Sequence, residues 1–242
     1  MTNHTDYGID APPVVVAASA VGLVAVLLAL VLRFSVPLAP YWPLPLLAGI
    51  IYLVLAAGFL ASSKVGKLRL RDWTLEAIDW RGDEQVLDVG CGKGLLLIGA
   101  AKHLTTGKAI GVDIWRTTDQ TGHSPAATIS NARAEGVEDR VDVRDGDARD
   151  LPFESSSFDV VLSGLVLHNL SRDEKPKAIR EMVRVLKPGG KLAIFDTWRI
   201  GVYAKELRSL QMDEVRFSVP FPLFLRPTRI LTARKPIGPS AR

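Results

Sequence analysis

Residues 86–94, Val86-Leu87-Asp88-Val89-Gly90-Cys91-Gly92-Lys93-Gly94, decide the fold, and an apolar stretch of helical length follows them. The apolar run predicts a buried strand, and the alternating glycines predict a tight turn into a helix. Glycine permits positive φ and lets a ligand approach the backbone closely. The free N–H groups and the positive dipole end of the new helix suit a carboxylate or a phosphate. Cys91, the single cysteine, is interpreted as a packing residue in this turn.

An acidic residue follows at a distance that is typical of nucleotide-binding folds. Asp113 ends the next predicted strand, 19 residues after Gly94, where a carboxylate can accept hydrogen bonds from two ribose hydroxyls. The dinucleotide fingerprint Gly-x-Gly-x-x-Gly would place its third glycine at position 95, where this chain has Leu95. The spacing therefore disfavours a nicotinamide dinucleotide. A tight strand-to-helix turn that binds no ligand remains the structural alternative.

Four further blocks accompany the glycine turn in a fixed order. They are GVDI (111–114), DGDARDLPF (145–153), SFDVVLSGLVLHNL (157–170) and RVLKPGG (184–190). With residues 86–94 they resemble the class I S-adenosylmethionine (SAM) dependent methyltransferases of the type 11 kind, over about 100 residues. The later blocks are most similar to the small-molecule branch, which includes quinone C-methyltransferases. The resemblance implies SAM as the cofactor.

The resemblance also implies nine cofactor-binding residues. Those at the methionine end of SAM are Asp88, Gly90, Gly92, Gly94 and Ser163; those at the ribose and adenine are Asp113, Ile114, Asp147 and Ala148. Asp88 would lie near the ammonium group, and Asp113 would hold the ribose. Ile114 would pack on the adenine, and Asp147 would accept from its amino group. For the two later aspartates the alternative is a solvated acid at a strand end or turn.

Methyl transfer from a sulfonium requires no metal, because the leaving thioether is neutral, and we expect none. A phenol, enol or activated carbon acceptor does benefit from a base. His168, six residues after Leu162, is the candidate base, and Asn169 beside it could orient a substrate oxygen. The alternative is a loop histidine that caps the backbone. His103 and His123 are weaker candidates.

Sequence motifs that the chain lacks restrict the class of methyl acceptor. Residues 163–166 read Ser-Gly-Leu-Val, where nucleic-acid amino methyltransferases have Asn/Asp-Pro-Pro-aromatic, and no cysteine follows that position. The chain also lacks a basic platform with interleaved aromatic residues, so no nucleic acid is expected. A small-molecule or lipid acceptor remains. The polar stretch Trp115–Pro125 is interpreted as a flap over the adenine or substrate, or as a solvated loop.

Strand-length apolar runs alternate with helical patterns, which predicts an α/β fold with a doubly wound, mostly parallel, seven-stranded sheet. The predicted strands are Gln85–Val89, Ala109–Val112, Val141–Arg144, Phe158–Leu162, Lys191–Phe195, Glu214–Val219 and Arg229–Ala233. The predicted helices are Leu95–Leu104, Ala126–Glu135, Lys175–Leu186 and Tyr203–Gln211. Lys187–Gly190 is interpreted as a helix stop and turn. The last two strands, joined by a proline-rich loop, should be antiparallel.

The first sixty residues hold only three charged side chains, Asp6, Asp10 and Arg33. Two apolar runs, 11–32 and 44–61, reach about 33 Å and about 27 Å as helices and predict a transmembrane hairpin. A cleaved signal peptide is the alternative for the first run. Small residues on it, among them Gly22 and Ala29, permit close contact between helices.

Basic residues after the second run predict its orientation. Lys64, Lys67, Arg69 and Arg71 place the rest of the chain in the cytoplasm, at the cell membrane. The predicted division is a tail (1–10), the hairpin (11–61), a juxtamembrane amphipathic helix (62–82), the SAM-binding domain (83–236) and a second tail (237–242). The bilayer and a lipophilic acceptor such as a quinone or lipid are the expected partners. A non-catalytic SAM-binding module and a soluble acceptor remain alternatives.

Overall fold

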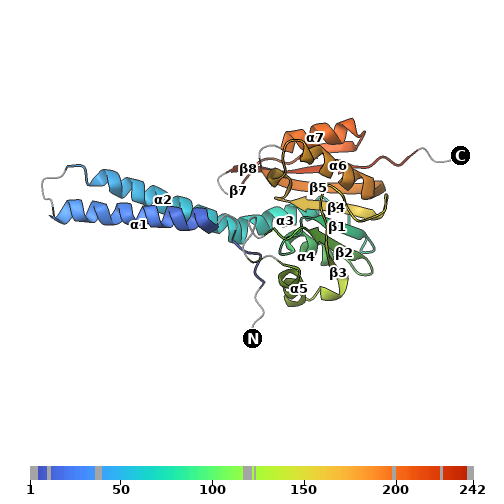
Figure 1. The fold of residues 1–242 in the computed structure, drawn as a ribbon, viewed down its shortest axis with the longest axis horizontal. Helices are drawn as coiled ribbons and strands as arrows, with labels where there is room; N and C mark the ends of the chain where they lie inside the picture. The colour runs from blue at the N-terminus through green and yellow to red at the C-terminus, as the bar shows by residue number, and fades with distance from the viewer. Residues whose placement is uncertain are drawn as a thin grey trace.

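The computed structural model describes residues 5–9, 12–35, 40–116, 122, 124–197, 200–223 and 226–238. A central sheet lies between two layers of helices, and a long pair of helices projects from one end of it (Figure 1). These two parts correspond to the predicted globular domain and the predicted helical hairpin.

The sheet has the strand order β3-β2-β1-β4-β5-β8-β6, and β7 also pairs with β8. The strands are β1 (Gln85–Val89), β2 (Lys108–Asp113), β3 (Val141–Asp145), β4 (Phe158–Gly164), β5 (Leu186–Thr197), β6 (Asp213–Phe217), β7 (Phe221–Leu223) and β8 (Arg226–Arg234). The first five are parallel, whereas β8 is antiparallel to each of its three neighbours. The α/β class and all seven predicted strands are confirmed. The additional strand, β7, is three residues long in a proline-rich segment and gives no alternating pattern.

Each face of the sheet has its own hydrophobic core. The helices α3 (Lys67–Glu76), α4 (Leu95–Ala101) and α5 (Pro125–Ala134) cover one face, and α6 (Glu174–Val185) and α7 (Ile200–Ser209) cover the other (Figure 1). Neighbouring residues of β1 point to opposite sides, so that Val86 packs with the first group and Leu87 with the second. A strand buried on both faces is rich in apolar residues, and Val86, Leu87 and Val89 follow this pattern, which only Asp88 interrupts.

The segment Lys187–Gly190 corrects one expectation. α6 does end at Val185, but β5 begins at Leu186, so these residues lie within a strand rather than in a turn. Gly189 has φ +78°, and its N–H donates to the carbonyl oxygen of Lys235 at 2.9 Å. The pairing of β4 with β5 shifts register over this segment. The glycines thus permit an irregularity inside the strand, which a turn signal in the sequence resembles.

The projecting pair consists of α1 (Pro12–Ser35) and α2 (Pro43–Ala61). Gly22 and Gly49 lie where the two helices meet: a Cβ on Gly49 would come within 2.8 Å of the carbonyl oxygen of Gly22. Ala29 and Ala56 are also buried between the helices. Both helices are long and apolar enough to cross a bilayer, and most of their large side chains face outward.

The second helix of the pair continues into the globular part. α2 passes through a π-helical turn, η1 (Ser62–Gly66), directly into α3. Among the apolar residues of this helix, Trp73 is 45% exposed, whereas Leu70 is buried. The buried face follows Leu70, Thr74 and Ile78 at helical spacing, and Trp73 lies about 100° round the helix from Thr74.

Candidate cofactor and acceptor site

The predicted site residues gather at the edge where the parallel strands end, called the carboxyl edge below. β1 and β4 are neighbours at the centre of the sheet, and the chain leaves them toward opposite faces, to α4 and to α6. Open α/β sheets bind ligands in the crevice that forms where the strand order reverses in this way. The turns after β1, β2 and β4 therefore surround the candidate site.

The glycine turn after β1 needs glycine for steric reasons. Gly90, Gly92 and Gly94 have φ values of +75°, +49° and +85°. A Cβ on Gly90 would come within 2.3 Å of Cγ2 of Val166, in the segment that follows β4. The N–H groups of Gly90 and Cys91 donate to the carbonyl oxygen of Val112 at 2.8 and 3.0 Å, which fastens the turn to the end of β2.

Asp88 is a buried carboxylate beneath this turn, with 2% of its surface exposed. Its Oδ2 accepts a hydrogen bond from the Leu97 N–H at 2.9 Å, while Oδ1 has no partner among the described residues. Burial, and to a smaller extent the charge of Asp113, raises the pKa of Asp88 to about 7, against the opposing effect of the Leu97 hydrogen bond. An ammonium group at Oδ1 would satisfy the unpaired oxygen and favour the ionised form. The residue therefore fits the methionine end of SAM.

Asp113 braces the glycine turn. Its Oδ2 accepts from the Gly92 N–H at 2.9 Å, and its Oδ1 accepts from the Trp115 N–H at 2.8 Å. If this carboxylate held a ribose, the ribose hydroxyls would donate to the same two oxygens that already accept from the Gly92 and Trp115 N–H groups. Ile114, beside it, is 42% exposed, as a residue that packs on an adenine ring would be. Trp115 donates from Nε1 to Asp145 at 2.7 Å, a contact that the sequence reasoning missed.

Asp147 and Ala148 lie in the turn after β3. Both carboxylate oxygens of Asp147 accept from the Arg149 guanidinium, which also pairs with Glu174. The pKa of Asp147 is lowered, chiefly by the hydrogen bond from that guanidinium. Contact with an adenine amino group would require this oxygen pair to be shared with Arg149. Ala148 is half-buried and packs at the margin of the α6–α7 core.

Ser163 does not face an open site. It is 1% exposed, and its hydroxyl donates to the carbonyl oxygen of Val89 at 2.9 Å. In this structure the residue fastens the end of β4 to the end of β1, so its contribution to the site is to hold the two strands together.

His168 lies in a short 3₁₀ turn, η3 (Leu167–Asn169), and is held by a buried carboxylate that the sequence reasoning missed. Asp196, at the end of β5, is fully buried; its Oδ1 lies 2.8 Å from Nδ1 of His168, and its Oδ2 accepts from the His168 backbone N–H at 3.0 Å. Tyr203 of α7 donates its hydroxyl to the same carboxylate at 3.0 Å. The available signal was that Asp196 is an acid at the carboxyl end of a predicted strand.

Of the two weaker histidine candidates, the structure describes only His103, which lies away from this edge. His103 stacks on Trp80 with ring centroids 5.1 Å apart, past the far end of α4. His123 and residues 117–121 of the expected flap lie outside the described residues. The described part of the chain contains no group of three or more His, Cys, Asp or Glu side chains placed to hold a metal ion.

This is the fold of the class I SAM-dependent methyltransferases. The features that define it are the strand order, the antiparallel strands β6, β7 and β8 at one side of the sheet, and the glycine turn above Asp88. Comparison with known families agrees. Residues 87–194 match the family described as methyltransferase domain. SAM is the cofactor of this class, and the unpaired oxygen of Asp88 and the crowded glycine turn fit it.

Several curated relatives are named as quinone methyltransferases, among them the following two. The chain is 36% identical over 130 residues to a 2-phytyl-1,4-beta-naphthoquinone methyltransferase of Arabidopsis thaliana, covering 52% of this chain and 48% of the relative. It is 35% identical over 130 residues to a demethylmenaquinone methyltransferase of Lactiplantibacillus plantarum, covering 52% and 51%. The chain thus spans about half the length of these curated relatives.

Solved structures show the same fold at lower identity. The [4+2]-cyclase SpnF superposes with a TM-score of 0.59 at 23% identity, covering 71% of this chain and 82% of that one. A SAM-dependent methyltransferase from Aquifex aeolicus gives 0.52 at 21% identity, covering 72% and 97%. At these identities the likeness concerns the fold alone.

Proposed function

We propose that the chain is a membrane-anchored methyltransferase that transfers the methyl group of SAM to a lipophilic acceptor, quinone-like or lipid-like, on the cytoplasmic side. The observation on which the proposal rests is the His168–Asp196 pair, which lies at the carboxyl edge beside the glycine turn. The quinone methyltransferases among the relatives support the acceptor class. The two long apolar helices support the anchor.

The cofactor side supplies binding and orientation. SAM, when bound, supplies a methyl group on a sulfonium, which a nucleophile attacks in line as a neutral thioether leaves. Asp88 Oδ1 would accept from the ammonium group of the methionine part, and the glycine turn would lie along that part with its backbone. Asp113 would hold the ribose from the end of β2. Fixing both reactants in a water-poor crevice accounts for much of the acceleration in such transfers.

The acceptor side supplies a base. The Asp196 carboxylate can only accept a hydrogen bond from the Nδ1 side of the His168 ring. The neutral imidazole therefore has its proton on Nδ1 and its lone pair on Nε2. Nε2 would then remove the proton of a phenol or enol as the methyl group is transferred. Burial of Asp196 and its bond from Tyr203 keep the carboxylate in one place, so the imidazole is oriented before the acceptor binds.

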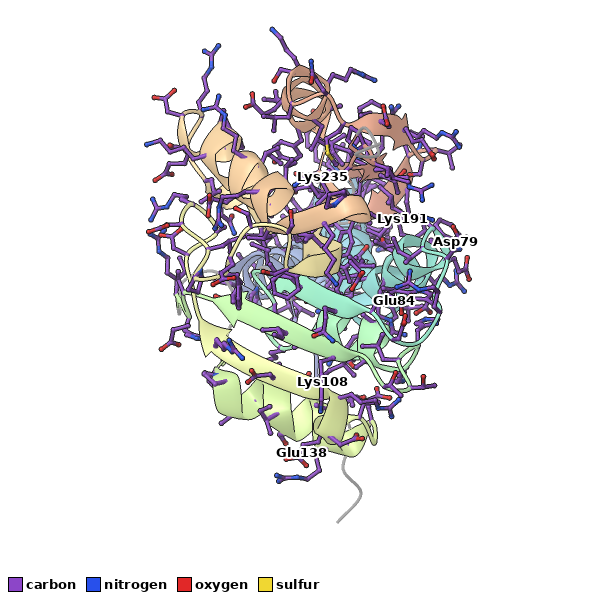
Figure 2. All side chains as sticks on the ribbon, turned by 90° about the vertical axis from the view of Figure 1, so that its right-hand side faces the viewer. Asp79, Glu84, Lys108, Glu138, Lys191 and Lys235 are labelled. Carbon is purple, nitrogen blue, oxygen red and sulfur yellow. The ribbon has the colours of Figure 1, made fainter. Side chains whose placement is uncertain are left out.

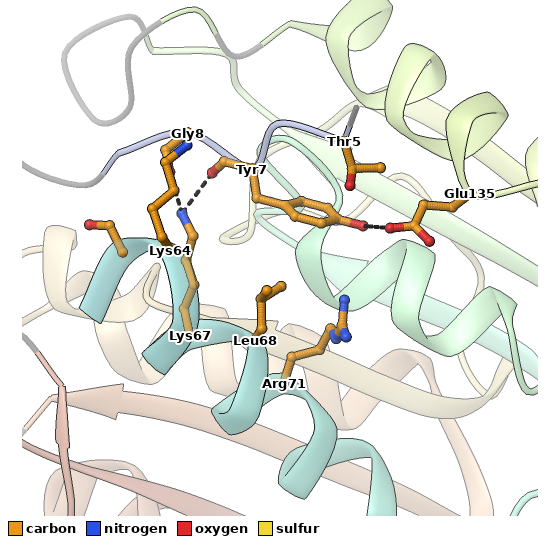
Figure 3. A pocket seen from close by; sticks show the side chains of 9 residues that line it. Thr5, Tyr7, Gly8, Lys64, Lys67, Leu68, Arg71 and Glu135 are labelled. Carbon is orange, nitrogen blue, oxygen red and sulfur yellow. Dashed lines mark hydrogen bonds between the residues drawn. The ribbon is translucent and has the colours of Figure 1, made fainter. Parts of the chain in front are cut away.

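The N-terminal segment supports a two-pass topology with both ends on one side. Lys67 is 3% exposed, and its ammonium group donates to the carbonyl oxygens of Tyr7 and Gly8 at 2.7 and 2.8 Å (Figure 3). The Tyr7 hydroxyl donates to Glu135 of the loop after α5 at 3.3 Å. Residues before α1 thus contact residues after α2. With the basic residues after α2, this supports a cytoplasmic catalytic domain.

The test uses the full chain in lipid nanodiscs with methyl-labelled SAM. The acceptors are a naphthoquinol that carries an isoprenoid tail and its analogue without the tail. Mass spectrometry detects the product in which one labelled methyl group has replaced a hydrogen. We expect methylation of the tailed acceptor and its loss in His168→Ala, with unchanged SAM affinity by calorimetry. SAM binding without transfer to any acceptor would favour the non-catalytic module. Preference for the analogue without the tail would favour a soluble substrate.

A further inference from the structure

The candidate site opens beside the end of the helical pair. The Asp6 carboxylate lies 3.4 Å from the ammonium group of Lys64 and 3.1 Å from that of Lys93. Lys64 is three residues past the end of α2, and Lys93 belongs to the glycine turn. One carboxylate therefore links the end of the candidate span to the cofactor turn. If α2 crosses a bilayer, the carboxyl edge lies next to the bilayer surface.

Exposed apolar side chains occur at this edge. Val219, just before β7, is 77% exposed, and Trp73 of α3 is 45% exposed. The Trp73 ring packs edge-on against Phe221 of β7, with centroids 5.2 Å apart. Phe221 pairs with Thr228, which pairs with Thr197 at the end of β5, so this group belongs to the carboxyl edge. We call Trp73, Val219 and Phe221 the apolar rim.

The opposite edge of the sheet, where the parallel strands begin, carries charged side chains. It faces the viewer in Figure 2, and charged side chains such as Asp79, Lys108 and Lys191 lie along it. Lys191 forms an ion pair with Asp79 there. Ile237 is exposed and apolar at that edge as well, whereas the apolar rim brings three apolar side chains, two of them aromatic, together at the edge that carries the site. Large apolar groups exposed next to a membrane anchor are typical of a surface that meets lipid.

We propose that the apolar rim docks on the lipid bilayer and that the acceptor reaches the carboxyl edge from the lipid phase, without passing through bulk water. This inference rests on the proposed membrane anchoring and extends it from the hairpin to the catalytic domain. The continuous helix from α2 through η1 to α3 fixes the rim relative to the hairpin. The exposed aromatic ring of Trp73 suits the interface between headgroups and hydrocarbon.

The depth of the rim can be measured on the full chain in liposomes of phosphatidylcholine and phosphatidylglycerol. Single spin labels are attached at Leu27→Cys in α1, at Val219→Cys in the rim and at Ile237→Cys as the control. Leu27 and Ile237 are 61% and 74% exposed, and Ile237 lies against Gly189, near the start of β5 at the opposite edge. Burial raises the pKa of the Cys91 thiol, so the native cysteine reacts slowly, and the unsubstituted chain gives the background.

The readout is the collision rate of each label with lipid-soluble O2 relative to a water-soluble nickel chelate. We expect this ratio to be highest at position 27 and several-fold higher at 219 than at 237. Equal ratios at 219 and 237, with position 27 in lipid, would overturn the inference and leave the anchoring intact. A label at position 27 that meets water would overturn the anchoring itself, and the inference with it.

A pair of charge substitutions tests the entry of the acceptor. Val219→Glu should raise KM for the tailed naphthoquinol in liposomes about tenfold, because it removes the burial of one apolar side chain in lipid. Ile237→Glu, at a similarly exposed position, should leave KM unchanged, and both variants should keep the wild-type KM for the tail-less analogue. An equal rise in both variants, or no rise in Val219→Glu, would contradict entry from the lipid phase. SAM affinity by calorimetry confirms that each variant is folded.

Discussion

The two halves of the carboxyl edge are built from different kinds of contact. On the cofactor half, Asp88, the glycine turn and Asp113 lie within 26 residues and are held largely by backbone N–H groups. On the acceptor half, His168, Asp196 and Tyr203 come from a 3₁₀ turn, a strand and a helix, and one buried carboxylate joins them. The first half is the proposed binding site of the cofactor, and the second is the proposed site of the base. Because the two halves are held by separate contacts, substitutions can test each of them in turn.

The largest effect is expected where the two halves touch, at Gly90. Gly90→Ala adds a Cβ within 2.3 Å of Val166 at a residue with φ +75°. Both the clash and the left-handed backbone oppose the change, so we expect a loss of about 2–4 kcal/mol in stability and no measurable SAM binding. Thermal unfolding and calorimetry measure these two quantities.

Gly136→Ala is the matched control for this substitution. Gly136 has φ +71°, but nothing lies within 4 Å of the position of its Cβ. The control should cost only about 1 kcal/mol, from the backbone alone, and keep SAM affinity. If Gly90→Ala behaves like the control, the contact with Val166 does not constrain the turn, and the halves are more independent than the structure implies.

Asp196→Asn should impair the acceptor half and leave the cofactor half unchanged. The amide keeps the shape of the carboxylate but no longer favours the tautomer with the Nδ1 proton, so turnover should fall about 100-fold. SAM affinity should stay within about twofold of the wild type, because no residue of the cofactor half bonds to Asp196. A shifted pH–rate profile would identify Asp196 as a positioning residue of the base.

Tyr203→Phe is the milder partner of that variant, since it removes one of the hydrogen bonds to the same carboxylate. It should lower turnover less than Asp196→Asn and leave the pH–rate profile in place. Normal turnover in Asp196→Asn would return His168 to a structural role.

The same division explains what the sequence could predict. The glycine spacing, the strand before it and the acid at the end of β2 are local patterns, and the structure has them at the predicted residues. The partner of His168 is not local: Asp196 lies 28 residues away, and only the pairing of β4 with β5 brings it near. Side-chain roles that depend on tertiary contacts, such as the buried hydroxyl of Ser163 or the guanidinium on Asp147, were also beyond the reach of a pattern.

A smaller effect on the cofactor half is expected from Asp88→Asn, and it depends on pH. The pKa of Asp88 in the folded chain, about 7, lies above the ordinary value of 3.8, so the ionised form destabilises the ligand-free fold. The stability that the protonated form provides is present below about pH 4 and is lost as the pH rises toward 7. Wild-type thermal stability should therefore fall over this range relative to Asp88→Asn.

Binding of SAM should have the opposite pH dependence. Its ammonium group favours the ionised carboxylate, so wild-type affinity should rise between pH 5 and 7, whereas Asp88→Asn should bind about tenfold more weakly at pH 7. The two proteins are compared by calorimetry at both pH values. An affinity of wild type that does not vary with pH would mean that Oδ1 meets no cation.

The smallest effect tests whether the N-terminal segment belongs to the cofactor half. Lys67→Met keeps the length of a buried side chain but removes the bonds to the carbonyl oxygens of Tyr7 and Gly8. Release of that segment would free Lys93 from Asp6, so SAM affinity should fall about two- to fivefold, while the acceptor KM stays the same. Arg69→Met, at an exposed position of the same helix, is the control and should leave both constants unchanged. Limited proteolysis should cleave residues 5–9 faster in Lys67→Met than in the control. A changed acceptor KM would show instead that the segment reaches across the edge, and that the two halves share a cover.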